Sequence, residues 1–268
     1  MMAAKPPVSG RPTRRRLLQS GAAGLALPRM VRSQTSIKRG RMTRVLVFDV
    51  NETLLDLRVL EPHFERVFGD KTMLREWFNQ VILYAEAVTL ADNYGNFGEI
   101  ARAALEMTAA AQNVRLSSED AQLIVGGIRN LPAHYEVAAS LNQLKSAGFR
   151  MVTLTNSPPA VVEAQMQNSG LRPYFERSFS VDSVRKYKPA PEPYRMVARE
   201  LGVETSQLLM IAAHAWDVGG AMRAGCAAAF IARPGKALFP LFPKPYIVGR
   251  DLSEVSAAII KLEMASKV

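Results

Sequence analysis

Short apolar runs recur along the chain from residue 44 onward, separated by longer amphipathic stretches. Four of the runs are bounded by polar turns: RVLVF (44–48), FRMVTLT (149–155), LLMIAA (208–213) and AAAFIA (227–232). Such runs, apolar at consecutive positions, are typical of strands buried on both faces, as in parallel sheets. We therefore predict strands at these four places, followed by a last short strand and a C-terminal helix within residues 246–265.

The stretches between the runs have helical patterns. The segments PPAVVEAQMQNSG (158–170) and PEPYRMVARELG (191–202) begin near a proline and close with a glycine, the asymmetry expected of helix ends. Strands that alternate with helices in this way form parallel sheets with right-handed crossovers. The predicted fold class is therefore α/β, with a Rossmann-like doubly wound parallel sheet.

The region from residue 58 to residue 145 interrupts this alternation. It contains helical patterns and no strand pattern, with the helices expected at 71–90, 96–112, 117–130 and 133–148. We expect an α/β core built from residues 43–57 and 146–268, with an all-helical cap subdomain inserted over residues 58–145. Because the insertion follows the first strand directly, it should cover the carboxyl edge of the sheet, where open α/β folds bind ligands.

The positive charge of the chain is concentrated at its N-terminus. The chain has 34 Lys and Arg residues against 24 Asp and Glu residues, a net charge of +10. Eleven of the basic residues and none of the acidic ones lie within residues 1–44, so the remainder carries a net charge of −1. A body with balanced charge argues against nucleic-acid binding, because binding to phosphates requires clustered Lys and Arg.

Residues 1–42 have the pattern of an export leader and are left out of the fold prediction. The segment TRRRLLQSGAAGLALPRM (13–30) places paired arginines before a mildly apolar run, as in twin-arginine signals that direct folded proteins to the periplasm. Met42, just before TRVLVFDV, leaves open a cytoplasmic form that starts there. The single Cys226 cannot form an intramolecular disulfide. No apolar run approaches the roughly 18 residues of a membrane span.

Polar side chains follow the ends of the predicted strands. They are Asp49 after the first run, Thr155 and Asn156 after the second, His214 and Asp217 after LLMIAA, and, before a proline-rich helix start, Lys188 with Tyr194 six residues later. Because parallel strands end at one edge of a sheet, we expect these groups to converge. An ionised Asp49 could attack an electrophilic centre, and Lys188 could hold its charge. Hydroxyl and amide groups could bind an anionic substrate, and Asp217 could orient Lys188 or a water molecule.

The segments FDVNETLLD, TLTNSP, YKPAPEPY and HAWD together resemble the four motifs of the haloacid dehalogenase superfamily, specifically of its type II L-2-haloacid dehalogenases. The resemblance extends from about Arg44 to Val248. It implies a hydrolase in which Asp49 displaces halide from C2 of a short 2-haloacid with inversion, after which water cleaves the ester to release a 2-hydroxy acid. It implies no metal or other cofactor, and a homodimer as a candidate assembly.

The resemblance also implies a set of site residues. Those expected to take part in catalysis are Asp49, Thr53, Lys188 and Asp217, with Thr53 supporting the nucleophile and Lys188 balancing charge. Those expected to bind substrate are Asn51, Thr155, Asn156, Tyr194 and His214, with Thr155 and Asn156 contacting the substrate carboxylate.

Three places differ from the family pattern. Asn51 stands where the family usually has tyrosine, and Ala212, Ala213 and His214 stand where it has Ser-x-Asn. Phe78 stands at the place of the cap arginine that receives the halide, and Arg75, on the same helical face, is a candidate replacement. His214 could polarise the hydrolytic water or bind substrate or leaving group, or it could make only a structural hydrogen bond.

Two other functions stay open. A phosphatase of the same superfamily would use Mg²⁺ and an acid two residues after the nucleophile. Asn51 cannot supply that proton, a contribution of about 10²–10⁴-fold, and Asp217 alone offers few of the oxygen ligands that Mg²⁺ needs. A non-catalytic binding protein is the third possibility, which Phe78 and Ala212 leave open. The joint occurrence of Asp49, Thr155, Lys188 and Asp217 favours the dehalogenase.

Overall fold

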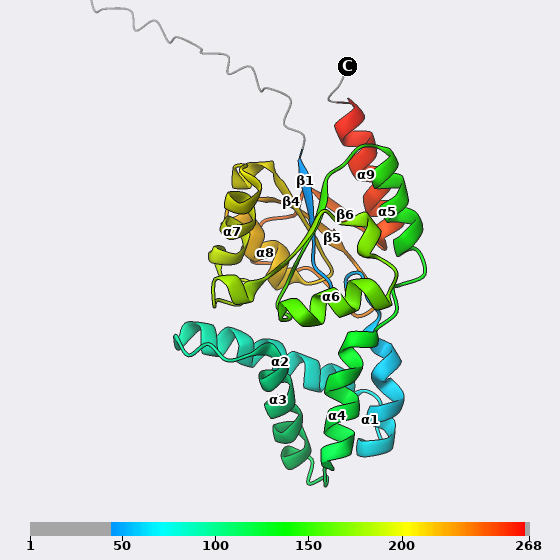
Figure 1. Cartoon of the computed structure of the whole chain (residues 1–268), viewed down its shortest axis with the longest axis vertical. Coiled ribbons are helices and arrows are strands. Elements are labelled where there is room, and N and C mark those ends of the chain that lie inside the picture. Colours follow the sequence, from blue (N-terminus) through cyan, green and yellow to red (C-terminus); the bar gives the residue numbers. More distant parts are fainter. Residues whose placement is uncertain (1–43, 266–268) are drawn as a thin grey trace, which may run out of the picture. The chain divides into compact units, whose positions relative to one another are not determined.

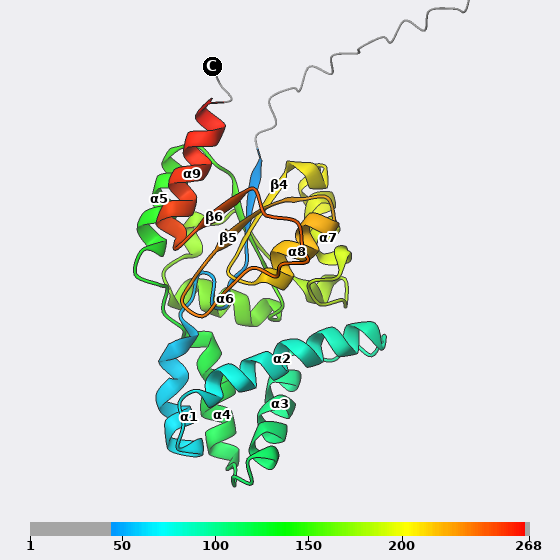
Figure 2. The ribbon, with the colours of Figure 1, turned by 180° about the vertical axis from the view of Figure 1, so that it is seen from behind.

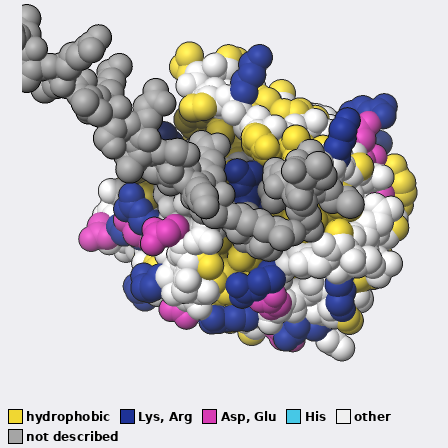
Figure 3. All heavy atoms as spheres, turned by 90° about the horizontal axis from the view of Figure 1, so that it is seen from above, with side chains coloured by type: hydrophobic (Ala, Val, Ile, Leu, Met, Phe, Trp, Pro, Cys, Tyr) yellow, Lys and Arg dark blue, Asp and Glu magenta, His cyan; other side chains and the backbone are white. Residues whose placement is uncertain are grey.

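The structure is a computed structural model that describes residues 44–265 (Figure 1). The expected export leader and the alternative start at Met42 lie outside the described residues. On the face shown in Figure 3, Lys and Arg side chains are scattered among acidic, hydrophobic and other groups. Within residues 44–265, no helix is long and apolar enough to cross a membrane.

Within the described residues, six parallel strands form one sheet in the order β3-β2-β1-β4-β5-β6. The strands are β1 (Val45–Phe48), β2 (Met151–Thr155), β3 (Arg177–Ser180), β4 (Leu208–Ala212), β5 (Ala227–Ile231) and β6 (Ile247–Gly249). The chain moves outward from β1 to β3, then returns beside β1 and moves outward the other way. The strand order reverses between β1 and β4, so the expected ligand position lies at the carboxyl ends of these two strands. The predicted doubly wound parallel sheet is confirmed.

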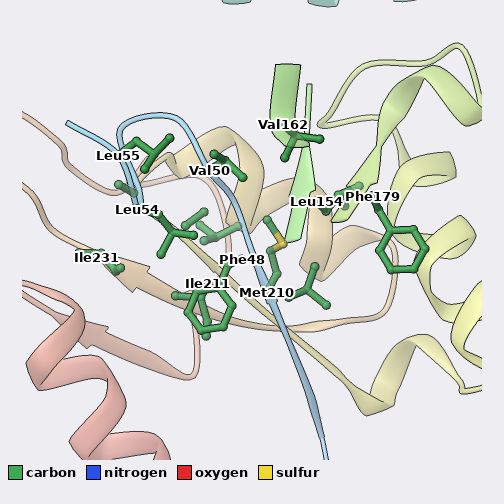
Figure 4. Packing of buried hydrophobic residues seen from close by; sticks show 14 of the residues in the cluster. Phe48, Val50, Leu54, Leu55, Leu154, Val162, Phe179, Met210, Ile211 and Ile231 are labelled. Atoms are coloured by element: carbon green, nitrogen blue, oxygen red, sulfur yellow. The ribbon is translucent and has the colours of Figure 1, made fainter. Parts of the chain in front are cut away.

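Helices cover both faces of the sheet (Figures 1 and 2). Helices α5 (Val137–Ser146) and α9 (Leu252–Ala265) lie side by side on one face, and α7 (Pro191–Leu201) and α8 (Ala215–Arg223) lie on the other. Helix α6 (Pro159–Asn168) packs next to β3. Strands β1, β2 and β4 are buried along their whole length as a result, and Figure 4 shows Phe48, Leu154 and Ile211 within the apolar core. The short 3-10 turns are η3 (Arg172–Tyr174), η4 (Val181–Ser183) and η5 (Thr205–Gln207).

The inserted helices form a separate group at the carboxyl ends of the strands, here called the cap. The cap consists of η1 (Leu57–Leu60), α1 (Glu61–Phe68), α2 (Met73–Leu90), α3 (Phe97–Ala111), α4 (Ser118–Gly127) and η2 (Ile128–Asn130). Helix α3 begins with a capping box of Asn96 and Glu99, and Ser117 caps α4. The two segments that join cap and core run side by side, and the Asp56 amide donates to the Pro132 carbonyl at 2.8 Å.

The structure differs from the prediction in the position of α5 and in the presence of β3. Helix α5, which we expected within the inserted cap up to residue 145, packs instead against α9 beside the sheet. Its apolar stripe of Val137, Leu141 and Leu144 is buried, and such a stripe looks the same in sequence whichever partner it meets. Strand β3 was not predicted. It is a short edge strand with the sequence RSFS, whose first residue is exposed, so it has no apolar run.

Helix α8 approaches the Lys188–Pro189 segment closely at Gly220. A Cβ atom at this position would lie 2.5 Å from the Pro189 Cβ atom and 2.6 Å from the Pro189 carbonyl oxygen. Backbone atoms cannot move aside as the end of a flexible side chain can, so only glycine fits here. Gly220 therefore allows α8 to pack against the segment that carries Lys188.

We predict that Gly220→Ala lowers the free energy of unfolding by about 1–3 kcal/mol, because the added methyl group overpacks this contact. The matched control is Gly126→Ala in α4, where a Cβ atom meets nothing within 4 Å. Alanine should stabilise that helix by about 0.5–1 kcal/mol. Urea unfolding followed by circular dichroism measures both changes, and equal effects would contradict the role given to Gly220.

Candidate active site

Asp49 follows β1 at the carboxyl edge of the sheet, and its carboxylate is almost fully buried. The Thr53 hydroxyl donates to Asp49 Oδ2 at 2.5 Å, and the Thr53 oxygen in turn accepts a hydrogen bond from the Ala213 amide at 2.9 Å. Thr53 is thereby fixed between the turn that follows β1 and the end of β4. The backbone amide of Asp49 donates to the Ile211 carbonyl, so this position is fixed as well.

The Lys188 ammonium group is completely buried and has three acceptors. Nζ donates to Asp49 Oδ1 at 2.9 Å, to Asp217 Oδ2 at 2.6 Å and to the Leu154 carbonyl at 3.0 Å. Burial lowers the pKa of Lys188, but the carboxylates of Asp217 and Asp49 outweigh it, and the net shift is upward. Lys188 therefore remains charged and joins the two acidic groups.

Asp217 lies in the first turn of α8, where negative charge is favoured at a helix N-terminus. The Tyr194 hydroxyl donates to Asp217 Oδ1 at 2.7 Å, so both carboxylate oxygens have a donor. Burial raises the pKa of Asp217, and the nearby Asp49 raises it further, against the opposing effect of Lys188. Tyr194 is buried with its hydroxyl bonded to Asp217, so it supports that carboxylate.

His214 lies between two carboxylates. Its Nδ1 atom is 3.1 Å from Asp49 Oδ2, and its Nε2 atom is 2.9 Å from Glu52 Oε2. Ionised carboxylates only accept hydrogen bonds, so both ring nitrogens must carry a proton and the ring is an imidazolium. Burial would lower the pKa of His214, but the hydrogen bonds to Asp49 and Glu52 raise it to about 9. A charged His214 is therefore expected at neutral pH.

Glu52 continues this series of contacts to Lys236, whose Nζ atom lies 2.7 Å from Glu52 Oε2. The result is a chain of alternating charges, here called the charge chain, formed by Asp217, Lys188, Asp49, His214, Glu52 and Lys236. Three anionic and three cationic groups balance each other.

Burial would raise the pKa of Asp49, but Lys188 and His214 hold that pKa well below its usual range. The pKa of Glu52 falls to about 2 because His214 and Lys236 outweigh burial.

The predicted substrate-binding residues that follow β1 and end β2 differ in what their side chains contact. Asn51 is committed within the protein, because its Nδ2 donates to Ser157 Oγ at 3.2 Å and its Oδ1 accepts from Gln165 Nε2 at 2.8 Å. The Thr155 hydroxyl accepts from the Ser157 amide at 3.1 Å. Asn156 Oδ1 accepts from the Lys188 amide, but its buried Nδ2 has no hydrogen-bond partner within residues 44–265. A donor remains available at Asn156.

The cap contributes an aromatic side chain beside His214. The ring centroids of Phe78 and His214 are 6.5 Å apart, and His214 stacks on Trp216 at 4.9 Å. Phe78 is buried, whereas Arg75 is exposed and its guanidinium lies against Gly235. The cap side chain beside His214 is therefore Phe78, whereas Arg75 meets the core at Gly235, next to Lys236.

The structure brings the nine expected site residues to one edge of the sheet, although Asn51 and Tyr194 contact protein groups there. The sequence-based prediction missed Glu52 and Lys236. Glu52 lies inside the first motif, but its backbone φ of 58° is outside the right-handed helical and extended regions. No residue pattern in the sequence predicts this conformation. Lys236 is 184 positions from Glu52 in sequence, so nothing local connects them.

We predict that His214 makes the stability of the protein depend on pH. The folded protein holds the imidazolium proton up to about pH 9, whereas an unfolded histidine releases it near pH 6.5. The contribution of the protonated His214 to the free energy of unfolding is therefore fully present below pH 6.5. As the pH rises to about 9, this contribution of as much as about 3 kcal/mol is lost.

Urea unfolding at pH 6 and at pH 9.5 measures this loss, and His214→Asn, which cannot titrate, is the control. The wild-type protein should lose more stability than the variant between these two pH values. An equal loss in both proteins would show that His214 is not held protonated.

The chain is similar to proteins of known sequence and structure that are named 2-haloacid dehalogenases. The (S)-2-haloacid dehalogenase of Pseudomonas sp. (strain YL) is 28% identical over 192 residues, covering 71% of this chain and 83% of that protein. The (S)-2-haloacid dehalogenase of Pseudomonas fluorescens is 28% identical over 213 residues, covering 78% and 93%. The crystal structure of an L-2-haloacid dehalogenase superposes with a TM-score of 0.77 at 28% identity, covering 82% of this chain and 98% of that one.

The family model for haloacid dehalogenase-like hydrolases matches residues 43–225, about two thirds of the chain. The match includes β1 with Asp49, the whole cap, the Lys188 segment and α8 with Asp217. Fold, site and family model therefore agree, and the chain belongs to the haloacid dehalogenase-like hydrolases.

Proposed function

We propose that this protein is a 2-haloacid dehalogenase of the (S)-specific type. The observation that carries the proposal is the buried Asp49 carboxylate, held ionised by Lys188 and bonded to Thr53. A carboxylate in this state is a nucleophile that needs no proton removed before it attacks. Similarity to relatives named (S)-2-haloacid dehalogenase supports the substrate class.

The proposed reaction has two steps at Asp49. The carboxylate attacks C2 of a short 2-haloacid, the halide leaves with the electron pair of the carbon–halogen bond, and an ester forms with inverted configuration. Water then attacks the Asp49 carboxyl carbon and releases a 2-hydroxy acid. Asp217, next to Lys188 and with its pKa raised by burial, is suited to orient that water and receive its proton.

The substrate carboxylate would bind where the chain leaves β2. The Asn156 amide has a donor without a partner among the described residues, and Thr155 offers a hydroxyl group next to it. A buried donor without a partner costs free energy, which an incoming carboxylate would recover. Asn51 does not take part in this binding, because its amide is bonded to Ser157 and Gln165.

A Mg²⁺-dependent phosphatase fits these residues less well. A metal ion at this edge would need the carboxylate oxygens of Asp49 and Asp217, and both carboxylates are bonded to the Lys188 ammonium. Within the described residues, no group of three His, Cys, Asp or Glu side chains is arranged to hold a metal ion. Asn51 has no proton to give a leaving alcohol, and its side chain is already bonded elsewhere.

Export and assembly are separate proposals. We propose that the arginine-rich segment at 13–30 directs the protein to the periplasm and that the protein forms a homodimer. N-terminal sequencing of the native protein tests the first proposal, since a retained leader would contradict it. Light scattering of the purified protein tests the second, and a monomeric mass would contradict it.

We predict that the purified protein releases chloride from L-2-chloropropionate in buffer without added metal. Asp49→Asn should abolish this release, because an amide is a poor nucleophile at carbon. The Gly126→Ala variant, which changes an exposed face of the cap, should retain it.

A parallel assay with p-nitrophenyl phosphate and Mg²⁺ separates the alternatives. Metal-dependent phosphate release would establish the phosphatase instead. Silence of the wild-type protein in both assays would favour a binding protein, the possibility that Phe78 leaves open.

A further inference from the structure

We propose that Glu52 and Lys236 are positioning residues that hold His214 as a donor to the carbonyl oxygen of the Asp49 ester, so that His214 and Thr53 together form an oxyanion hole for ester hydrolysis. The inference rests on the proposed dehalogenase function, because it concerns the ester formed in that reaction. It assigns a role to two residues outside the expected site.

The two oxygens of Asp49 have different surroundings. Oδ2 accepts from the Thr53 hydroxyl at 2.5 Å and from His214 Nδ1 at 3.1 Å, whereas Oδ1 accepts from Lys188 Nζ at 2.9 Å. The oxygen that attacks carbon must use a lone pair for the new bond, and Oδ1 has the fewer donors to give up. The geometry therefore makes Oδ1 the attacking atom and leaves Oδ2 as the carbonyl oxygen of the ester.

Charge then develops on Oδ2 during hydrolysis. The water oxygen bonds to the Asp49 carboxyl carbon, the carbonyl π pair moves onto Oδ2, and one water proton passes to Asp217. When the intermediate collapses, the bond from the carboxyl carbon to Oδ1 breaks. Its electron pair leaves with the product oxygen, which takes the proton from Asp217. The new Asp49 carboxyl group then loses its remaining proton to solvent. Donors already placed at Oδ2 stabilise this charge without rearrangement.

His214 can donate to Oδ2 only while Nδ1 carries a proton, and Glu52 secures this. While Asp49 is ionised, it lies 3.1 Å from Nδ1 and the Glu52 carboxylate lies 2.9 Å from Nε2, so both ring nitrogens are protonated. Once Asp49 is esterified, the negative charge of Glu52 still favours the imidazolium, which carries a proton on Nδ1. If position 52 were uncharged, a neutral imidazole would keep its proton on Nε2 or on Nδ1 and would donate to Oδ2 only in the second case. Lys236, 2.7 Å from the same Glu52 oxygen, holds Glu52 in place and balances its charge.

The backbone at Glu52 supports a functional reason for this arrangement. Its φ of 58° lies in the left-handed region, which residues other than glycine, asparagine and aspartate rarely adopt. Such conformations persist where surrounding contacts enforce them, and they concentrate at functional sites. The hydrogen bonds of His214 also argue against this residue as the halide acceptor, because both of its N–H groups are already bonded to Asp49 and Glu52.

The test compares the two chemical steps in Glu52→Gln, a variant of nearly equal size. Chloride release in the first turnover should stay within about threefold of the wild-type rate. Ester hydrolysis should slow by about 10²-fold, the lower end of the effect of removing one oxyanion-hole donor. Rapid-quench experiments with L-2-chloropropionate should then show a burst of about one chloride per active site, with the ester on the Asp49 peptide detected by mass spectrometry.

Two further variants complete the test. Lys236→Met should slow hydrolysis in the same direction but less, because Glu52 keeps its charge. Lys244→Met, an exposed lysine on the same loop, should leave both steps unchanged. The high-pH limb of hydrolysis reports the pKa of His214 in the ester, which lies below the value of about 9 in the free protein because the esterified Asp49 has lost its charge. This limb should move to still lower pH in Glu52→Gln. A role confined to packing would not move that limb.

The outcomes of these assays distinguish a failure of the proposed function from a failure of this inference alone. If the wild-type protein releases no halide, the proposed function and this inference both fail. If the wild-type protein releases halide, but Glu52→Gln either hydrolyses its ester at the normal rate or slows both steps equally, the inference alone fails.

Discussion

The contact on which the rest of the site depends is the buried ammonium of Lys188 between Asp49 and Asp217. Removing such a group from water costs several kcal/mol, which only charged partners and complete hydrogen bonding offset. Lys188 meets this requirement with two carboxylates and the Leu154 carbonyl. The partners come from the ends of β1 and β2 and from the first turn of α8, so the sheet register and the close packing of α8 at Gly220 both serve this contact.

Charge balance extends from this contact and determines the chemistry. Asp49 stays ionised because cations lie on both of its sides, and His214 stays charged because carboxylates lie on both of its sides. Asn51, at the position where a phosphatase would need an acid, is part of a neutral network with Ser157 and Gln165. The site is therefore suited to attack by a carboxylate at carbon, with protein cations supplying the positive charge.

Much of the fold could be predicted because it depends on regular patterns. Apolar runs identified β1, β2, β4 and β5, and helix-end residues identified α6 and α7. The prediction failed where the pattern is weak or has two meanings. Strand β3 lies at an edge and needs no apolar run, and the apolar stripe of α5 fits a partner in the core as well as one in the cap. The motif residues Asp49, Lys188 and Asp217 were found because each lies near the end of a strand or the start of a helix.

The sequence by itself determined the strand and helix alternation, the inserted helices and the residue types at the sheet edge, because these depend on local periodicity and on short motifs. The tertiary structure alone decided what those residues contact. It turned Asn51 and Tyr194 toward protein partners, placed Phe78 rather than Arg75 beside His214, and joined Glu52 to Lys236 across 184 positions. Hydrogen bonds and charge pairs act over a few ångströms in space, and only the folded chain sets those distances.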